Sequence, residues 1–408
     1  MCFRHLLCRN PQRRKLGGNM DKNKWHGFRS VLIVGLMLNA VAAAEARTWT
    51  VHPGGSINAA ILKARPGDRI NVMPGIYHEG SPGDLNAVTI TVDQIAIVGL
   101  SRANQPVVLE NAGGQRFGIW VSPLDSTGAV AEANNEEPPC ASTGSTIHGF
   151  SIQGFTLRGF DGHGLHLACV DGFLIDGNVA ENNGVYGLFP VTSRHGALTN
   201  NTVQGTVSDA GLYVGQSDDV LIRGNDATDN LIGIEVENSR NVAVIENQLS
   251  NNTIGIFVDV LFGKVELTQE RTLVAYNNVH DNNRPNNSDP DDITAIFPAG
   301  LGILLVGADT TAVTQNDITR NGFAGIAVSS LCLAFTIQNQ PCPPLDVDPN
   351  PDNNRIVRNR VTGNGTIPTS SVLDMFRGDL VWDRSGVGNC WQDNKFGTSF
   401  PPVLPACR

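Results

Sequence analysis

The chain has 408 residues, with 29 Lys and Arg against 39 Asp and Glu, and a formal net charge of −10. This acidic balance argues against a nucleic-acid partner, because proteins that bind nucleic acids typically present a basic surface. Hydrophobic residues make up 41% of the chain, which is enough for a folded protein with a sizeable core.

The first predicted segment is an export signal. A basic stretch precedes an apolar run from Val31 to Ala43, and Ala44-Glu45-Ala46 offers a small-x-small cleavage site. The pattern predicts a signal peptide over residues 1–46, with Met20 as the natural start, and a secreted or periplasmic protein. No other run is long enough for a membrane span. Cleavage would leave 21 basic and 37 acidic residues, a formal net charge of −16, which repels polyanionic glycans unless a divalent cation mediates.

A short helix is predicted next. Ser56 is a helix-capping residue, and Ile57, Ala60 and Ile61 follow at the spacing of one helical face. Such a helix would cover the open N-terminal end of a repeat protein. After a Pro-Gly-Asp turn, residues 70–72 are the first predicted strand.

Asparagine then recurs with a fixed phase. The first column comprises Asn178, Asn201, Asn225, Asn247, Asn277, Asn316 and Asn359. Five residues later a second column comprises Asn183, Thr206, Asn230, Asn252, Asn282, Asn321 and Asn364. The first three intervals are 23, 24 and 22 residues, the period of a solenoid. Asparagine suits these turns because it tolerates left-handed backbone angles and because stacked side chains can bond along the column.

The apolar residues between these turns alternate in twos, as strands require. Each repeat contains a Gly followed by two aliphatic residues that flank one variable residue, as in Gly233-Ile-Glu-Val. We therefore predict an all-β fold, a right-handed parallel β-helix with a short N-terminal capping helix and an irregular C-terminal cap. A leucine-rich horseshoe is the rival solenoid, but regularly placed Leu and an outer helix are both missing from the pattern.

The repeat sets the predicted domain limits. The solenoid covers residues 47–365, and a capping tail covers residues 366–408. Longer intervals predict loop insertions near residues 122–145, 261–271, 284–300 and 330–352. Insertions of this kind commonly fall on one face, often the binding face.

Six cysteines follow the predicted export signal: Cys140, Cys169, Cys332, Cys342, Cys390 and Cys407. An even number in an exported chain favours disulfides, although the sequence alone permits fifteen pairings. Short loops favour Cys332–Cys342 and Cys390–Cys407, which leaves Cys140–Cys169. Buried free thiols are the alternative.

The stretch Asp209-Ala-Gly-Leu-Tyr-Val-Gly-Gln-Ser-Asp-Asp-Val, with the export signal and the Asn columns, resembles exported parallel β-helix proteins of the pectin-lyase-like superfamily. The resemblance covers roughly residues 50 to 365. It implies the fold, but not one activity, because that superfamily includes lyases, epimerases, hydrolases and members with no assigned reaction.

The outward residues of the Gly-containing strands form two columns in the predicted register. One column contains His166, Phe189, Tyr213, Glu235, Phe257, Leu304 and Ala327. The other contains Ala168, Val191, Gly215, Glu237, Asp259, Val306 and Ser329. Aromatic rings beside acids suit a glycan, so a polysaccharide or cell-envelope glycan is the expected partner. The alternative is that outward aromatics only stabilise the sheet by cross-strand packing.

If the chain is an enzyme, uronate β-elimination or C5 epimerisation is the first hypothesis. Tyr213 and His166 are the predicted proton-transfer pair, with Glu235 as a third catalytic residue. The predicted substrate-binding residues are His163, Tyr186, Phe189, Arg194, Glu237, Phe257 and Asp259. His195 is an alternative to Arg194 for the uronate carboxylate. Asp171, Arg194, Asp218 and Arg240 share one repeat position, however, and alternating charges there also predict a purely structural ladder.

Other functions stay open. A glycosidase would use Glu235, Glu237 and Asp259 on neighbouring coils, but the aspartate pattern of β-helical galacturonan hydrolases and the Asp-Pro-His-Asp element of alginate epimerases are missing. No cofactor is certain; calcium is the candidate, through acids in residues 289–292 or through Asp346, Asp348 and Asp352. No metal-ligating residues are predicted otherwise.

Two non-enzymatic roles complete the alternatives. One is a glycan-binding or envelope scaffold protein. The other resembles the β-helical accessory proteins that help mature the copper site of nitrous oxide reductase. Only two methionines, Met73 and Met375, follow the export signal, which disfavours the handling of a soft metal.

Overall fold

The computed structural model describes residues 46–124, 140, 145–288, 293–369 and 372–408. The predicted export signal lies outside the described residues except for Ala46, as do most of the loop predicted at 122–145 and the acids of residues 289–292. Among the described residues, no helix has the length and apolar character that crossing a bilayer requires.

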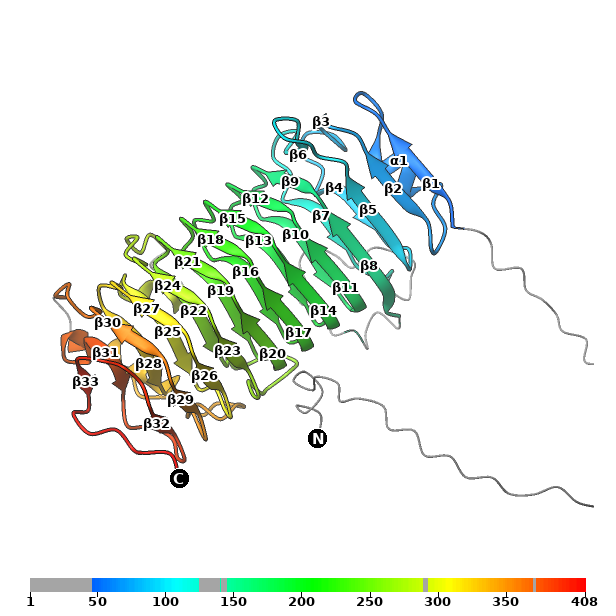
Figure 1. The fold of residues 1–408 in the computed structure, drawn as a ribbon. Helices are drawn as coiled ribbons and strands as arrows, with labels where there is room; N and C mark the ends of the chain where they lie inside the picture. The colour runs from blue at the N-terminus through cyan, green and yellow to red at the C-terminus, as the bar shows by residue number, and fades with distance from the viewer. Residues whose placement is uncertain (1–45, 125–139, 141–144, 289–292, 370–371) are drawn as a thin grey trace, which may run out of the picture. The chain divides into compact units, whose positions relative to one another are not determined.

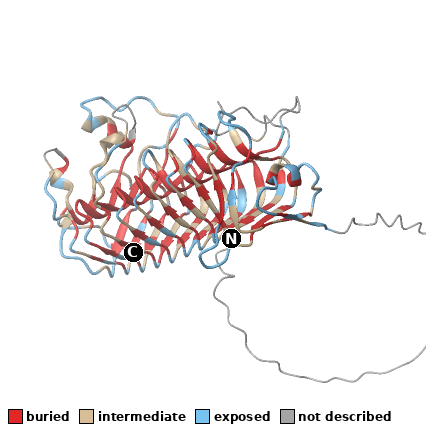
Figure 2. Cartoon of the chain, turned by 90° about the horizontal axis from the view of Figure 1, so that it is seen from above, coloured by how far each residue is buried: buried red, intermediate tan, exposed pale blue. Residues whose placement is uncertain are grey.

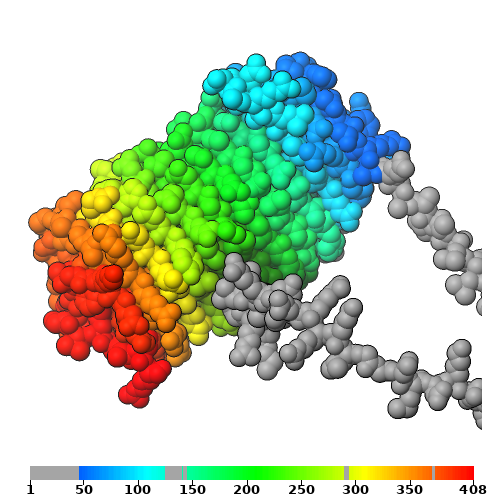
Figure 3. All heavy atoms as spheres, in the orientation of Figure 1, coloured from blue at the N-terminus to red at the C-terminus, as the bar shows by residue number. Residues whose placement is uncertain are grey.

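The described chain is a parallel β-helix, as predicted (Figure 1). Three sheets run along it, and each coil between the two ends contributes one strand to each sheet, paired in parallel with the coils before and after. In the space-filling view the colours from blue to red follow one another along the solenoid, as expected when each coil packs on its neighbours (Figure 3).

Sheet A has twelve strands: β1 (Thr48–Val51), β2 (Arg69–Val72), β5 (Ile95–Gly99), β8 (Ile147–Gln153), β11 (Val170–Asp176), β14 (Arg194–Thr199), β17 (Asp218–Arg223), β20 (Arg240–Ile245), β23 (Leu273–Ala275), β26 (Ala312–Thr314), β29 (Arg355–Val357) and β32 (Cys390–Gln392). Sheet B has ten: β3 (Gly75–Tyr77), β6 (Val107–Glu110), β9 (Phe155–Arg158), β12 (Val179–Glu181), β15 (Thr202–Gln204), β18 (Asp226–Thr228), β21 (Gln248–Ser250), β24 (Asn278–His280), β27 (Asp317–Thr319) and β30 (Arg360–Thr362). Sheet C has eleven: β4 (Asn86–Ile90), β7 (Phe117–Val121), β10 (His163–Ala168), β13 (Tyr186–Val191), β16 (Ala210–Gly215), β19 (Ile232–Glu237), β22 (Ile254–Asp259), β25 (Leu301–Val306), β28 (Ala324–Ser329), β31 (Gly378–Trp382) and β33 (Ser399–Phe400).

The helical elements are short. The predicted capping helix is α1 (Ile57–Ile61), and the Ser56 side chain accepts a hydrogen bond from the Ala59 amide at 3.1 Å. Two 3₁₀ turns, η1 (Ile293–Ile296) and η2 (Val372–Phe376), and α3 (Cys332–Ile337) lie in or near the insertions between coils. The prediction of the first strand at residues 70–72 was wrong, because β1 pairs with β2 ahead of it. β1 lies before the Asn repeat begins, so the repeat gave no signal for it.

The Asn columns are buried ladders of hydrogen bonds. Asn225 is typical: its Oδ1 accepts from the amide and the Nδ2 of Asn201 at 2.9 and 3.0 Å. Its own amide and Nδ2 donate to Asn247 Oδ1 at 2.9 and 3.0 Å, and Nδ2 also donates to the Leu198 carbonyl at 3.0 Å. The predicted bonding along the column is therefore confirmed, and it satisfies backbone groups that the turns would otherwise leave unpaired.

The backbone reason that we gave for these asparagines was wrong. In every coil the left-handed residue is the one before the column: Gly177, Asn200, Gly224, Glu246, Tyr276, Gln315 and Arg358 all have positive φ. The column asparagines themselves do not. Their amide side chains, which both donate and accept, are what the position requires.

The C-terminal coils continue further than the sequence pattern indicated. Asn394 accepts from the Asn359 amide at 2.9 Å and so extends the first Asn column. Asn389 accepts from the Asn354 amide at 3.0 Å in a separate ladder of the same kind. At the end of the second column Asp379 takes the place of an asparagine, because its Oδ1 accepts from Asn364 Nδ2 at 2.9 Å. Strands β31, β32 and β33 then extend sheets A and C into the tail that was predicted as an irregular cap.

All three predicted disulfides are present: Cys140–Cys169, Cys332–Cys342 and Cys390–Cys407. The second closes the segment that contains α3, and the third ties the C-terminal residues to β32. Disulfides of this kind stabilise mainly by constraining the unfolded chain.

Sheet C differs from the other two sheets in its burial, which can be followed in Figure 2. Strands of sheet A such as β20 alternate buried and half-exposed residues. In contrast, all six residues of β16, β19, β22, β25 and β28 are buried. The inward side chains join the main core, and the apolar outward ones join a second apolar cluster with Leu261, Phe297, Phe335 and Phe376. The outer face of sheet C is therefore covered where these coils lie.

Candidate functional site

The register predicted for the outward columns is the one observed. Tyr213 pairs with Glu235, Glu235 with Phe257, and Phe257 with Leu304. In the second column Glu237 pairs with Asp259. These columns lie on the covered face of sheet C, beneath residues from the predicted insertions 261–271, 284–300 and 330–352. The predicted strip is thus a buried interface in these coils.

The N-terminal part of the strip is an aromatic stack. Trp120 stacks on His166, with ring centroids 3.8 Å apart, and His166 stacks on Phe189 at 5.2 Å. Phe189 in turn stacks on Tyr213 at 4.4 Å. Each ring comes from a different coil, and Phe189 lies between His166 and Tyr213. The predicted proton-transfer pair is therefore not in contact. Such stacks contribute to the stability of a sheet.

His163 and His166 lie within this stack, with their Nδ1 atoms 3.3 Å apart. Both are fully buried. Burial, and then the neighbouring His163, lower the pKa of His166 well below its usual value, so this imidazole is neutral at neutral pH. Trp120 was not predicted, because the coil that contains β7 carries no column asparagine to set its register.

Arg194 and His195 belong to a different surface. They begin β14 in sheet A, where Arg194 Nη2 lies 2.8 Å and His195 Nδ1 lies 2.6 Å from the carboxylate of Asp171. Asp171, Arg194, Asp218 and Arg240 occupy successive positions of the ladder. The hydrogen bond from His195, and those from Arg194, lower the pKa of Asp171. The structural alternative for Arg194 is therefore the one the contacts support.

Removal of this ladder arginine is expected to have a small effect. Arg194 is 58% exposed, and exposed ion pairs contribute about 0.2–1 kcal/mol. Arg194→Ala should therefore lower the free energy of unfolding, measured with urea, by less than about 1 kcal/mol. A loss above about 2 kcal/mol would show that the ladder acts as a cooperative network.

A cavity of about 210 Å³ lies between the outer face of sheet C and its cover. Five predicted site residues line it: Tyr186, Glu235, Glu237, Phe257 and Asp259. Asp209 and Lys264 line the same end, and the sequence did not point to either as a site residue. Phe189, His163, His166 and Arg194 are not among the lining residues.

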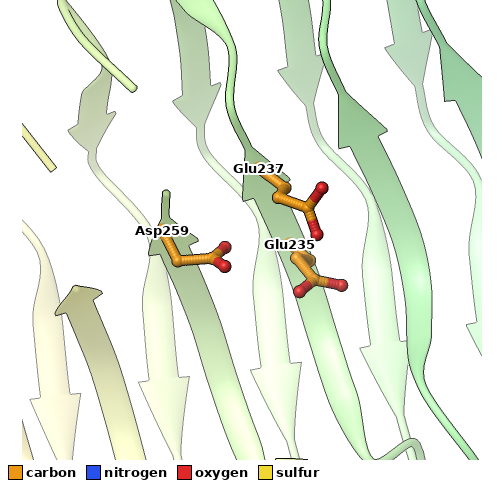
Figure 4. A group of neighbouring side chains, drawn as sticks. All are labelled: Glu235, Glu237 and Asp259. Atoms are coloured by element: carbon orange, nitrogen blue, oxygen red, sulfur yellow. The ribbon is translucent and has the colours of Figure 1, made fainter. Parts of the chain in front are cut away.

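Carboxylates gather at one end of the cavity. Glu235 and Glu237 lie on β19 and Asp259 lies on β22, and one oxygen from each falls within 4.8 Å of the others (Figure 4). Their relative accessibilities are 4%, 4% and 1%. Two outward residues of one strand and one from the next coil are side by side because the strand period is two residues.

Hydrogen bonds account for only part of this cluster. Tyr213 donates to Glu237 Oε1 at 3.0 Å, and Lys264 Nζ lies 3.2 Å from the same oxygen. Tyr186 donates to Asp209 at 2.7 Å. Among the described residues, neither oxygen of Asp259 nor Oε2 of Glu235 has a hydrogen-bond partner, although all three atoms are buried. Buried carboxylate oxygens without partners are costly and rare, so they indicate a missing partner.

The electrostatics agree with this geometry. Burial is the largest cause that raises the pKa of Glu235 well above its usual value, followed by the charges of Asp209 and Asp259. Burial, and then Glu237, raise the pKa of Asp259, whereas Lys264 acts in the opposite direction. Both pKa shifts favour the protonated carboxyl groups, and a bound cation would compete with these protons.

The family of this chain is shown by comparison with known proteins. Residues 88–294, just over half of the chain, match the family described as "Periplasmic copper-binding protein (NosD)". The chain belongs to this family. A search of curated proteins finds no match to this member of the NosD family.

Two solved structures share the fold of this NosD-family chain. The A-module of mannuronan C-5 epimerase AlgE6 from Azotobacter vinelandii is 14% identical, with a TM-score of 0.54, covering 84% of this chain and 82% of that chain. The A-module of mannuronan C-5 epimerase AlgE4 from Azotobacter vinelandii is 15% identical, with a TM-score of 0.50, covering 81% of this chain and 86% of that chain. At these identities the similarity concerns the β-helix fold alone.

The NosD family description names copper, so the side chains of this member can be compared with the ligands that copper favours. Copper favours thiolate, thioether and imidazole ligands. All six cysteines of the described chain are in disulfides. Met73 follows β2 near the N-terminal end of the solenoid, and Met375 lies in η2 near its C-terminal end. Within the described ranges, the only group of three or more His, Cys, Asp or Glu side chains is Glu235, Glu237 and Asp259. This donor set consists of oxygens and does not fit copper.

Proposed function

We propose that this NosD-family chain is a secreted or periplasmic binding protein that holds one hard divalent cation, Ca²⁺, between Glu235, Glu237 and Asp259. The observation that carries the proposal is Asp259, which is 1% exposed with both carboxylate oxygens unpartnered among the described residues and two further carboxylates beside it. A cation would supply the missing partner for all of these oxygens.

The nature of the ligands selects the class of metal. Carboxylate oxygens suit Mg²⁺, Ca²⁺ and Mn²⁺, and disfavour soft ions. Ca²⁺ binds oxygens at about 2.3–2.6 Å in irregular geometry, so oxygens up to about 5 Å apart can share it. The spacing of the cluster, within 4.8 Å, satisfies this condition without movement of the strands. Lys264 neutralises part of the remaining charge at 3.2 Å from Glu237.

The test is a calorimetric titration of the purified protein with Ca²⁺ after dialysis against EDTA. We expect one site per chain in the wild type, and Asp259→Asn should weaken binding by at least about tenfold because it removes a ligand charge. Asp226→Asn is the matched control, because Asp226 is an exposed carboxylate on β18, in the coil of Glu235 and Glu237. Equal binding by the wild type and Asp259→Asn would exclude the cluster, and Cu⁺ binding in preference to Ca²⁺ would exclude the choice of metal.

A uronate-directed reaction is the second candidate function. A cation at the cluster would neutralise a uronate carboxylate, and Tyr186 with Asp209, at 2.7 Å, lies at the same end of the cavity. The burial of this end opposes a polysaccharide substrate, because a long chain needs an open groove. Burial, and then Asp209, raise the pKa of Tyr186 well above its usual value, so Tyr186 can serve as an acid but not as a base at neutral pH.

Uronate polysaccharides with and without Ca²⁺ distinguish the two candidates. Ultraviolet absorbance from a new unsaturated uronate would report β-elimination, and proton exchange at C5 would report epimerisation. Either signal, lost in Tyr186→Phe, would establish an enzyme. If Ca²⁺ binds but no polysaccharide reacts or is retained on an affinity gel, the binding protein is the better account.

A further inference from the structure

The cavity continues from the carboxylate cluster into an apolar channel. Phe257, Leu304 and Ala327 form its floor in successive coils of sheet C. Phe297, which packs edge-on against Phe257 at 5.2 Å, and Leu331 are part of its cover. One continuous space therefore has carboxylates at one end and hydrocarbon along the rest, and a metal ion alone would fill only the first part.

The size of the space limits its occupant. A cavity of about 210 Å³ exceeds the roughly 150 Å³ apolar cavity that takes benzene in another protein. In proportion, the whole cavity, with its carboxylate end, has room for about eight carbon atoms, which sets the upper limit on the chain of the ligand. Apolar walls do not hold ordered water well, so an apolar ligand is the favoured content.

Charge indicates the head group of the ligand. Asp209 lies at the same end as Glu235, Glu237 and Asp259, and the charges of these four carboxylates exceed by one those of a divalent cation and Lys264. An anionic head group would add to this excess inside a buried site, at a high cost in free energy, and a cationic one would compete with the metal ion for the carboxylates. Ca²⁺ accepts six to eight oxygens, more than the cluster offers once Glu237 Oε1 is shared with Tyr213 and Lys264. A neutral oxygen in the channel would therefore complete the coordination.

We infer that the chain binds an uncharged, single-chain amphiphile of up to about eight carbons, whose hydroxyl or carbonyl oxygen completes the coordination of the cation and whose chain lies along Phe257, Leu304 and Ala327. This inference rests on the cation site of the proposed function. It has one testable consequence: the bound cation must increase the affinity of the protein for the amphiphile, and the bound amphiphile its affinity for the cation, because coupling between two ligands is reciprocal.

The experiment titrates Ca²⁺ into the full chain with and without 1-octanol. We expect 1-octanol to raise the Ca²⁺ association constant by about fivefold or more, the usual lower range of coupling between sites. Ala327→Phe should abolish this increase and leave Ca²⁺ binding in place, because Ala327 lies in the channel and not in the cluster. Retained Ca²⁺ binding also reports that the variant is folded; Ala327→Leu is the smaller replacement if it is not.

Each of the other outcomes would overturn one named part of the inference or of the proposed function. If Ca²⁺ binds and 1-octanol has no effect, or the same effect in Ala327→Phe, the amphiphile is wrong and the cation site stands. Stronger coupling with octanoate than with 1-octanol, or displacement of Ca²⁺ by octylammonium, would overturn the uncharged head group. Failure of the wild type to bind Ca²⁺ would remove the proposed function and this inference together.

Discussion

Asn225→Leu is expected to be one of the most destabilising single changes in the solenoid. The substitution removes the acceptor for the amide and Nδ2 of Asn201 and the donors to Leu198 and Asn247, all in a buried turn. Each buried polar group left without a partner costs about 1–3 kcal/mol, and leucine supplies none. We expect a loss of about 4 kcal/mol or more, read as a fall of the thermal midpoint of roughly 5–10 °C.

The control for this change is Gln248→Leu. Gln248 lies on β21 one coil later, and its side chain is exposed. Because exposed substitutions usually change stability by less than about 0.5 kcal/mol, its thermal midpoint should match the wild type. If Asn225→Leu also melts like the wild type, the Asn ladder is not what holds the turns together.

The stability of the metal-free protein is expected to fall as the pH rises above about 5. Glu235 and Asp259 have pKa values raised well above those of the unfolded chain, chiefly by burial. Above the unfolded pKa of about 4, the unfolded chain has lost these protons while the folded protein keeps them. The folded state therefore binds more protons, and stability declines with pH until the folded pKa values are passed. Each unit by which a pKa is raised costs about 1.4 kcal/mol.

Urea unfolding at several pH values, with EDTA or with Ca²⁺, measures this effect. Ca²⁺ should raise stability strongly at about pH 8 and weakly at about pH 5, where protons compete for the carboxylates. Asp259→Asn should show a shallower decline in EDTA. Two other groups also make stability depend on pH: the lowered pKa of His166 makes it rise with pH below about pH 6.5, whereas Asp309, with a pKa of about 6, makes it fall. Both groups are present in the wild type and in Asp259→Asn, so the difference between the two curves isolates the cluster. Parallel curves for wild type and variant would contradict the account.

Much of the fold was predictable because a solenoid repeats its local chemistry. The Asn phase fixed the register, and from it came the outward columns that the strand pairs of β16, β19 and β22 confirm. The three disulfides were also predictable, since short loops leave few pairings. Where the repeat is absent, as at β1 and β7, no register could be predicted, and Trp120 was missed.

The candidate site was predictable only in part. The repeat placed Glu235, Glu237 and Asp259 side by side, but it carried no information on whether insertions leave that face open or cover it. Lys264 reaches Glu237 from such an insertion, and Asp209 lies in the turn before β16, so neither belongs to the strand pattern. Two interpretations of the outward aromatic rings followed from the sequence, a sugar-binding surface and cross-strand packing, and the stacking and burial of the rings support the packing. Burial depends on contacts between segments far apart in the sequence, which the period of one repeat does not encode.

The central claim is that the carboxylate cluster on the covered face of sheet C holds a hard cation. The most direct measurement is anomalous diffraction from crystals of the purified protein grown with Mn²⁺, a hard ion that also takes oxygen ligands. The account predicts one strong peak within about 2.6 Å of oxygens from Glu235, Glu237 and Asp259, and no peak there in Asp259→Asn crystals. A wild-type crystal with no peak at the cluster, or with its peak elsewhere in the chain, would contradict it.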